Sequence, residues 1–173
     1  MSKQFDSQIS IVTGAGSGIG LATAEGLAAG GATVFCVDWK GAEEAAASIR
    51  AKGGNATGVA LDVRDSAGWR TLIEDVIERH GPIDILVNNA GIAVPGDTAA
   101  DVSEEVWDRI LDINAKGVWL GMRAVLPGMV ARKHGNRCAT LFGEFDQVIQ
   151  IDAEFACGFD RTGIVHLALP QGS

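Results

Sequence analysis

A glycine-rich turn near the N-terminus lies between a short apolar strand and a helix. Ile9–Thr13 are mostly β-branched and predict a strand, and the apolar residues from Leu21 to Ala28 recur at helical spacing. Between them stand Gly14, Gly16, Gly18 and Gly20. Such a turn lets backbone amides approach a pyrophosphate, and the helix N-terminus adds a positive dipole end. The combination of strand, turn and helix predicts a dinucleotide-binding α/β fold.

Short apolar strands and helices continue to alternate up to about residue 136. Because the strands are near-continuous apolar runs, we expect a parallel sheet covered on both faces, a Rossmann-like doubly wound α/β fold. The 173 residues are enough for one such domain, which we place at 1–136, followed by a tail at 137–173. The predicted strands are 9–13, 33–38, 57–61 and 83–87, and the predicted helices cover 42–52, about 69–77 and about 103–134.

The composition excludes several classes of function. A net charge of −8 argues against a nucleic-acid surface or an anionic membrane as partner. No apolar run is long enough to span a bilayer, and the N-terminus has no signal-peptide pattern. The three cysteines, Cys36, Cys138 and Cys157, are far apart and form no CxxC pair. We therefore expect a cytoplasmic protein without a metal site.

An acidic residue closes the second predicted strand. Asp38 lies 18 residues after Gly20, close to the spacing of about 20 that is typical of a ribose-binding carboxylate. A carboxylate there accepts hydrogen bonds from the adenosine hydroxyls and repels a 2′-phosphate. Lys40 leaves one cation nearby. The position of Asp38 favours NAD over NADP.

These motifs together resemble the short-chain dehydrogenase/reductase family. Its glycine pattern matches Thr13–Gly20, its Asp-Val pair matches Asp62-Val63, and its Asn-Asn-Ala-Gly loop matches Asn88–Gly91. Asn114 matches an asparagine that kinks a helix and holds a water of the proton relay in the family. The resemblance implies hydride transfer between NAD(H) and an unknown small alcohol or carbonyl substrate. The implied cofactor-binding residues are Gly14, Gly16, Ser17, Gly18, Ile19, Gly20, Asp38, Asp62, Val63, Asn89, Ala90 and Gly91.

The family's proton-transfer group has no match in this sequence. In the family a tyrosine is the acid/base, a lysine four residues later lowers its pKa, and a serine orients the substrate. Here there is no tyrosine, the last lysine is Lys133, and Ser173 is the one serine after Ser103. Counting along the chain places Phe155 near the tyrosine and Phe159 near the lysine. We therefore expect impaired catalysis, with Asn114 as the remaining relay position.

Residues 137–173 have no family counterpart that we identify, so we expect a sheet that is incomplete at its C-terminal half. Residues 138–142 favour a fifth strand, and 148–151 and 164–169 favour further strands from this chain or a second copy. We expect a homo-oligomer with contacts near Val118, Met122, Val125 and Met129. Three interpretations stay open: an oxidoreductase by descent, a non-catalytic NAD-binding or structural module, and a truncated product without activity.

Overall fold

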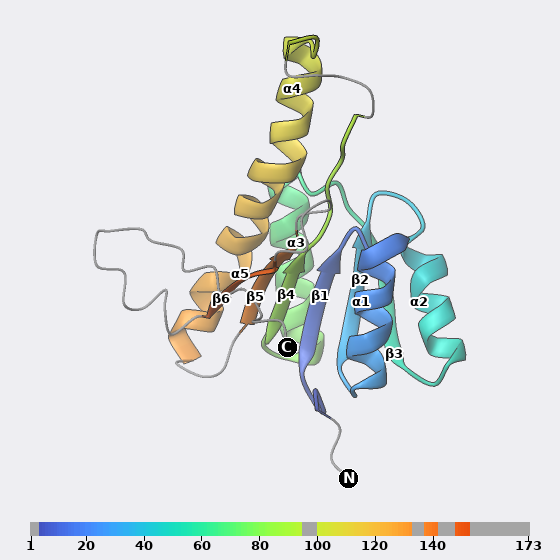
Figure 1. Cartoon of the computed structure of the whole chain (residues 1–173). Coiled ribbons are helices and arrows are strands. Elements are labelled where there is room, and N and C mark those ends of the chain that lie inside the picture. The colour runs from blue at the N-terminus through green and yellow to red at the C-terminus, as the bar shows by residue number, and fades with distance from the viewer. Residues whose placement is uncertain (1–3, 95–99, 133–136, 142–147, 153–173) are drawn as a thin grey trace, which may run out of the picture.

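The sheet is the centre of the structure, a computed structural model that describes residues 4–94, 100–132, 137–141 and 148–152, with side chains up to residue 132. Its strand order is β3-β2-β1-β4-β5-β6, and the first five run parallel (Figure 1). β6 pairs antiparallel with β5. The strands are β1 (Ile9–Thr13), β2 (Thr33–Asp38), β3 (Asn55–Ala60), β4 (Ile85–Asn88), β5 (Arg137–Leu141) and β6 (Val148–Asp152).

Helices cover both faces of this sheet, as the apolar strands require. α1 (Gly18–Ala29) and α2 (Ala42–Ala51) pack on one face, where their alanines meet Val34, Cys36 and Val87. α3 (Ser66–His80) and α5 (Val118–Arg132) pack on the other face. The doubly wound α/β architecture predicted from the sequence is confirmed.

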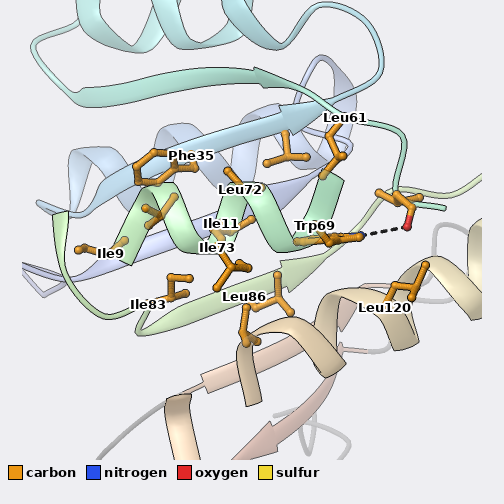
Figure 2. Close-up of a cluster of buried hydrophobic side chains, with 14 of the residues drawn as sticks. Ile9, Ile11, Phe35, Leu61, Trp69, Leu72, Ile73, Ile83, Leu86 and Leu120 are labelled. Atoms are coloured by element: carbon orange, nitrogen blue, oxygen red, sulfur yellow. Dashed lines mark hydrogen bonds between the residues drawn. The ribbon is translucent and has the colours of Figure 1, made fainter. Parts of the chain in front are cut away.

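The core between α3 and the sheet is built around Trp69. Its side chain is 1% exposed and lies among aliphatic side chains of β1, β4 and α3 (Figure 2). The indole Nε1–H donates a hydrogen bond to the carbonyl oxygen of Val63 at 3.0 Å. A buried indole needs such a partner, and here the partner is the loop that follows β3. Core packing thus holds Val63 in place.

The single helix predicted at 103–134 is divided in the structure into three consecutive helical segments. α4 (Glu104–Leu111) follows its N-cap residue Ser103, whose hydroxyl accepts a hydrogen bond from the N–H of Val106. A π-helical segment, η1 (Asp112–Gly117), leads into α5, which contains Pro127. The spacing of apolar residues does not reveal a π-helical segment, because such a segment adds less than one residue to each helical turn.

Two residues expected at a subunit contact lie elsewhere. Val125 is 3% exposed and Met129 is 1% exposed, and both belong to the core formed with α3 and β4. Their expected place at a contact is therefore wrong, because the packing face of α5 turns toward its own sheet. Val118 and Met122 are half-buried.

The predicted strand bounds shift by a few residues. The third strand begins at Asn55 because it pairs with β2 along its whole length, and Asn55 Nδ2 donates to Thr33 Oγ1 at 2.9 Å. The fourth strand begins at Ile85, since Asp84 Oδ2 accepts a hydrogen bond from the N–H of Ile9. A fifth strand and a strand from 148 are present in this same chain. The segment 164–169 lies outside the described residues.

Candidate functional site

The glycine turn after β1 depends on two residues without side chains. Gly14 has φ +66°, and a Cβ there would lie 2.7 Å from Asn89 Nδ2 and 2.9 Å from Ala90 Cα. Gly20 packs under the carbonyl of Gly14, so that α1 approaches β1 closely. A side chain at either position would push the loop after β4 or α1 away from the turn. The turn therefore forms a cradle at the carboxyl edge of the sheet.

The N-terminus of α1 opens into this cradle without a cap. Ser17 is the N-cap residue, but its side chain makes no capping hydrogen bond, and the first turn of α1 holds no acidic residue. The first N–H groups of a helix need partners and carry a partial positive charge. This helix end is therefore suited to an anionic ligand.

Asp38 at the end of β2 is held by two backbone groups. Its Oδ2 accepts a hydrogen bond from the N–H of Gly16 at 2.9 Å, and its Oδ1 accepts one from the N–H of Lys40 at 3.1 Å. The carboxylate is thereby oriented beside the glycine turn. The neighbouring indole of Trp39 is 80% exposed.

The loop after β4 is tied to the end of β1. Thr13 Oγ1 accepts hydrogen bonds from the N–H groups of Asn89 and Ala90, each at 3.0 Å, and donates to Val87 O at 3.3 Å. Asn89 Nδ2 donates back to Thr13 O at 3.0 Å and to Gly14 O at 3.3 Å. Hydrogen bonds therefore connect the two loops that flank the cavity.

Asp62 and Arg64 form an ion pair in the loop after β3. Arg64 Nη2 lies 2.6 Å from Asp62 Oδ2, and Arg64 Nε donates to both carboxylate oxygens. The hydrogen bonds from the Arg64 side chain hold the pKa of the Asp62 carboxyl below its usual value, and the same pair raises the pKa of Arg64. Both side chains are about two-fifths exposed.

Asn114 connects η1 to the loop after β4. Its Oδ1 accepts a hydrogen bond from the N–H of Ile92, and its Nδ2 donates to Ile92 O, each at 2.9 Å. A Cβ on Gly91 would lie 3.3 Å from Asn114 Oδ1, so the glycine permits this approach. Asn114 acts as a two-point clamp on backbone rather than as a cavity-lining group.

These elements surround one cavity of about 910 Å³. Its size suits a cofactor, since ligand pockets commonly hold about 300 to 1,000 Å³. Ten of the predicted site residues line it, while Gly18, Gly20 and Asn114 do not. The lining residues from that set are Gly14, Gly16, Ser17, Ile19, Asp38, Asp62, Val63, Asn89, Ala90 and Gly91.

Sequence reasoning did not assign the other lining residues to the site. Arg64 directly follows the Asp-Val pair, and this position next to Asp62 is the sequence feature that could have identified it as a site residue. Arg109 and Ile113 come from α4 and η1, and no local motif points to them. The remaining ones are Trp39, Lys40, Gly41, Leu61, Ile92, Ala93 and Val94. The positions of Phe155 and Phe159 fall outside the described residues.

The described residues include neither a metal-binding cluster nor a membrane-spanning helix. They contain no group of three or more His, Cys, Asp or Glu side chains able to hold a metal ion. Among their helices, none combines the length and the apolar character needed to cross a membrane.

Comparison with known proteins decides the family. The family model for the short chain dehydrogenases matches residues 8–137. The chain belongs to the short chain dehydrogenase family. It is 37% identical over 136 residues to the 2,3-dihydro-2,3-dihydroxybenzoate dehydrogenase of Bacillus subtilis, with 78% of this chain and 52% of the relative covered. It is also 37% identical over 158 residues to the oxidoreductase UcpA of Escherichia coli, with 91% and 59% covered.

Solved structures agree with this assignment. The citronellol catabolism dehydrogenase AtuB of Pseudomonas aeruginosa superposes with a TM-score of 0.75 at 35% identity, covering 83% of this chain and 59% of AtuB. The chain therefore spans between half and three-fifths of the length of these short chain dehydrogenases. Membership in an oxidoreductase family and its Rossmann-like fold are thus established for this chain.

Proposed function

We propose that this chain binds NAD(H) in the cavity described above. The observation that carries the proposal is the Asp38 carboxylate, oriented by the N–H groups of Gly16 and Lys40 beside the uncapped end of α1. A dinucleotide pyrophosphate fits the helix end and the glycine cradle, and a ribose diol fits a fixed carboxylate acceptor. In the cavity, the helix end with its glycine cradle lies next to the Asp38 carboxylate.

Charge at the cavity favours NAD(H) over NADP(H). A 2′-phosphate would come close to Asp38, and two like charges at short range repel each other. Three cations line the same cavity: Lys40, Arg64 and, from α4, Arg109. Arg64 is already paired with Asp62, so its charge is largely compensated. Lys40 and Arg109 are exposed, so solvent and salt weaken their attraction for a phosphate.

In chemical terms, bound NAD(H) supplies or accepts a hydride, and the residues of this chain bind and orient it. Asn89 and Ala90, held by Thr13, form the part of the cavity wall on the β4 side. Transfer of a hydride from an alcohol also needs a base for the hydroxyl proton. The sequence contains no tyrosine for that step. We therefore propose cofactor binding with impaired catalysis.

Calorimetric titration of the full chain with NADH and NADPH tests the binding proposal. We expect NADH to bind more tightly, and Asp38→Asn to reduce the difference because the repulsion is removed. Asp6→Asn is the matched control, since Asp6 is exposed and lies outside the cavity. Equal binding of both cofactors by the unchanged chain would contradict the NAD assignment.

An assay of turnover distinguishes a non-catalytic NAD-binding module from an active enzyme. NADH formation from a panel of secondary alcohols, followed at 340 nm, is expected to stay at the level of a chain-free blank. Steady NADH formation that Asn114→Ala abolishes would contradict impaired catalysis and would favour the second candidate function, an active NAD-dependent oxidoreductase.

We also propose that the chain forms a homo-oligomer through α4 and the start of α5. Trp107, Leu111 and Trp119 expose 52%, 43% and 50% of their surface. They make up three of the six large hydrophobic side chains that are exposed in the described ranges. Apolar side chains gathered on one helical segment are typical of a protein contact. A second copy would bury this segment symmetrically.

A further inference from the structure

β3 forms one edge of the sheet in the part of the chain that the structure describes (Figure 1). An edge strand presents a row of backbone N–H and C=O groups that a further strand can bind. On the β2 side, the N–H of Leu61 donates a hydrogen bond to Asp38 O at 3.0 Å. Because the backbone groups of a strand point alternately to its two sides, those of Ala56, Gly58 and Ala60 point away from β2. These three residues form the outer edge of β3.

The sequence of β3 does not protect this edge by itself. Asn55–Ala60 contains no charged residue and no proline, and the strand pairs with β2 along its whole length without a bulge. Charges, prolines and bulges are common means by which an edge strand avoids pairing with another chain. Any protection of the outer edge therefore comes from a neighbouring element.

Two side chains of α2 cover the middle of the outer edge. Arg50 Nη1 donates a hydrogen bond to Ala56 O at 2.9 Å. The Glu43 carboxylate accepts one hydrogen bond from the Arg50 side chain and another from the backbone N–H of Gly58, and both hold its pKa below the usual value. Arg50 Nη2 and Glu43 Oε1 are 2.6 Å apart. One ion pair thus occupies a backbone acceptor and a backbone donor of β3.

Local structure explains why this pair reaches the strand. Glu43 and Arg50 are seven residues apart in α2, which is close to two helical turns, so their side chains leave the same face of the helix. Gly58 lets the first turn of α2 lie directly against β3, since a Cβ there would collide with Glu43 Cα. Figure 1 shows α2 beside this end of the sheet. The helix therefore holds both side chains over the outer edge.

The exposure of the pair argues against a role in stabilising the fold. The side chains of Arg50 and Glu43 are 43% and 65% exposed. Ion pairs that are this exposed contribute little to the free energy of folding, because solvent screens them. An added strand, in contrast, needs both Ala56 O and the N–H of Gly58, whether it runs parallel or antiparallel to β3. The ion pair withholds both groups from it.

We propose that the Glu43–Arg50 pair closes the outer edge of β3 to strand addition by a second copy of this chain. A second copy has the matching chemistry, because its own β3 presents the same uncharged edge. Two such edges can pair about a twofold axis, which makes the two β3 strands antiparallel and joins the two sheets. The ion pair prevents this association, and its removal permits it.

Sedimentation velocity of the full chain tests the inference. The parent chain carries Trp107→Gln and Trp119→Gln, so that association through the exposed indoles of α4 and α5 does not contribute. The open-edge variant adds Glu43→Ala and Arg50→Ala, which together leave the net charge unchanged. We expect the open-edge variant to form a concentration-dependent species of roughly twice the parent mass. The parent is expected to show no such species.

Two further variants locate the contact. Glu25→Ala with Lys52→Ala is the matched control, because it removes an ion pair that joins α1 to the end of α2 instead of covering β3, and we expect the parent mass. Thr57→Lys in the open-edge variant places a charge on an exposed position of β3. Paired edges would bring two such charges together, so we expect this variant to return to the parent mass.

A thermal melt of each variant separates association from damage to the fold. Because the ion pair is exposed, we expect the open-edge variant to melt close to the parent. If it melts well below the parent, Arg50→Met repeats the test, since methionine keeps the apolar length of the side chain without its donors. We expect Arg50→Met to associate in the same way.

Three results would overturn the proposal. The first is a folded open-edge variant, or a folded Arg50→Met variant used in its place, that keeps the parent mass at every concentration. The second is equal association of the Glu25→Ala and Lys52→Ala control. The third is an association that Thr57→Lys does not reverse, because the contact would then lie away from β3.

Discussion

The hydroxyl oxygen of Thr13, at the end of β1, accepts a hydrogen bond from the backbone N–H of Asn89 at 3.0 Å. It accepts a second one from the N–H of Ala90 at the same distance. One buried threonine thus joins two loops that are more than seventy residues apart in the sequence. This oxygen, together with the Asn89 side chain that donates to Thr13 O and Gly14 O, fixes the two loops at the cavity.

Thr13→Val tests that dependence. Valine has nearly the same shape but no acceptor, so the two N–H groups lose their partner. We expect a loss of about 1–3 kcal/mol in the free energy of unfolding and weaker NADH binding. Urea unfolding and calorimetric titration measure the two effects. Thr13→Ser keeps the hydroxyl and is expected to retain most of both; equal behaviour of the two variants would contradict this role.

Gly14→Ala tests the need for a bare backbone in the turn. The added Cβ would meet Asn89 Nδ2 and Ala90 Cα, and φ is +66°. We expect a loss of at least about 1 kcal/mol in the free energy of unfolding. Gly26→Ala is the matched control: Gly26 lies in α1 with nothing within 4 Å of the added Cβ. There we expect a gain of up to about 1 kcal/mol.

Asn114→Leu tests the clamp between η1 and the loop after β4. The variant leaves the N–H and the C=O of Ile92 without partners. We expect a loss of about 1–3 kcal/mol in the free energy of unfolding, since both groups are partly buried. Asn55→Leu removes one exposed side-chain hydrogen bond and is expected to cost less. A larger effect at Asn55 would show that the clamp contributes little.

The buried thiol of Cys36 leads to a prediction for the stability of the fold at alkaline pH. Burial raises the pKa of its thiol from 9.0 to about 11. In the unfolded chain the thiol ionises near its ordinary value, so between pH 9 and 11 the unfolded state holds fewer protons there. This contribution to stability is complete below pH 9 and is lost as the pH rises toward 11. We expect Cys36→Ala to show a shallower decline of stability over that range in urea titrations.

Trp107→Gln and Trp119→Gln together test assembly. Both indoles are about half exposed, and a second copy would cover them in the proposed oligomer. We expect light scattering to show an oligomer for the unchanged chain and a monomer for the double variant at micromolar concentration. Trp39→Gln is the control, because Trp39 is also exposed but follows β2 and is not part of α4 or α5. A monomeric unchanged chain would refute the proposal.

The sequence allowed the fold to be predicted where local pattern and tertiary packing agree. The glycine turn, the apolar strands and Asp38 follow from short-range spacing, and the structure places them as expected. The π segment and the inward turn of Val125 and Met129 depend on contacts between α5 and the sheet, which spacing does not encode. Arg109 and Ile113 reach the cavity from another element, so they required the three-dimensional arrangement.

The far wall of the cavity is also its least anchored part. α4 carries Arg109 and contains no buried residue, whereas the neighbouring walls belong to the sheet and its core. Segments with little buried surface open at a small free energy, and their amide protons exchange with solvent first. Amide exchange at α4 should therefore be faster than at α1. A ligand that reaches Arg109 would slow it, so exchange protection of α4 reports how far along the cavity a bound molecule extends.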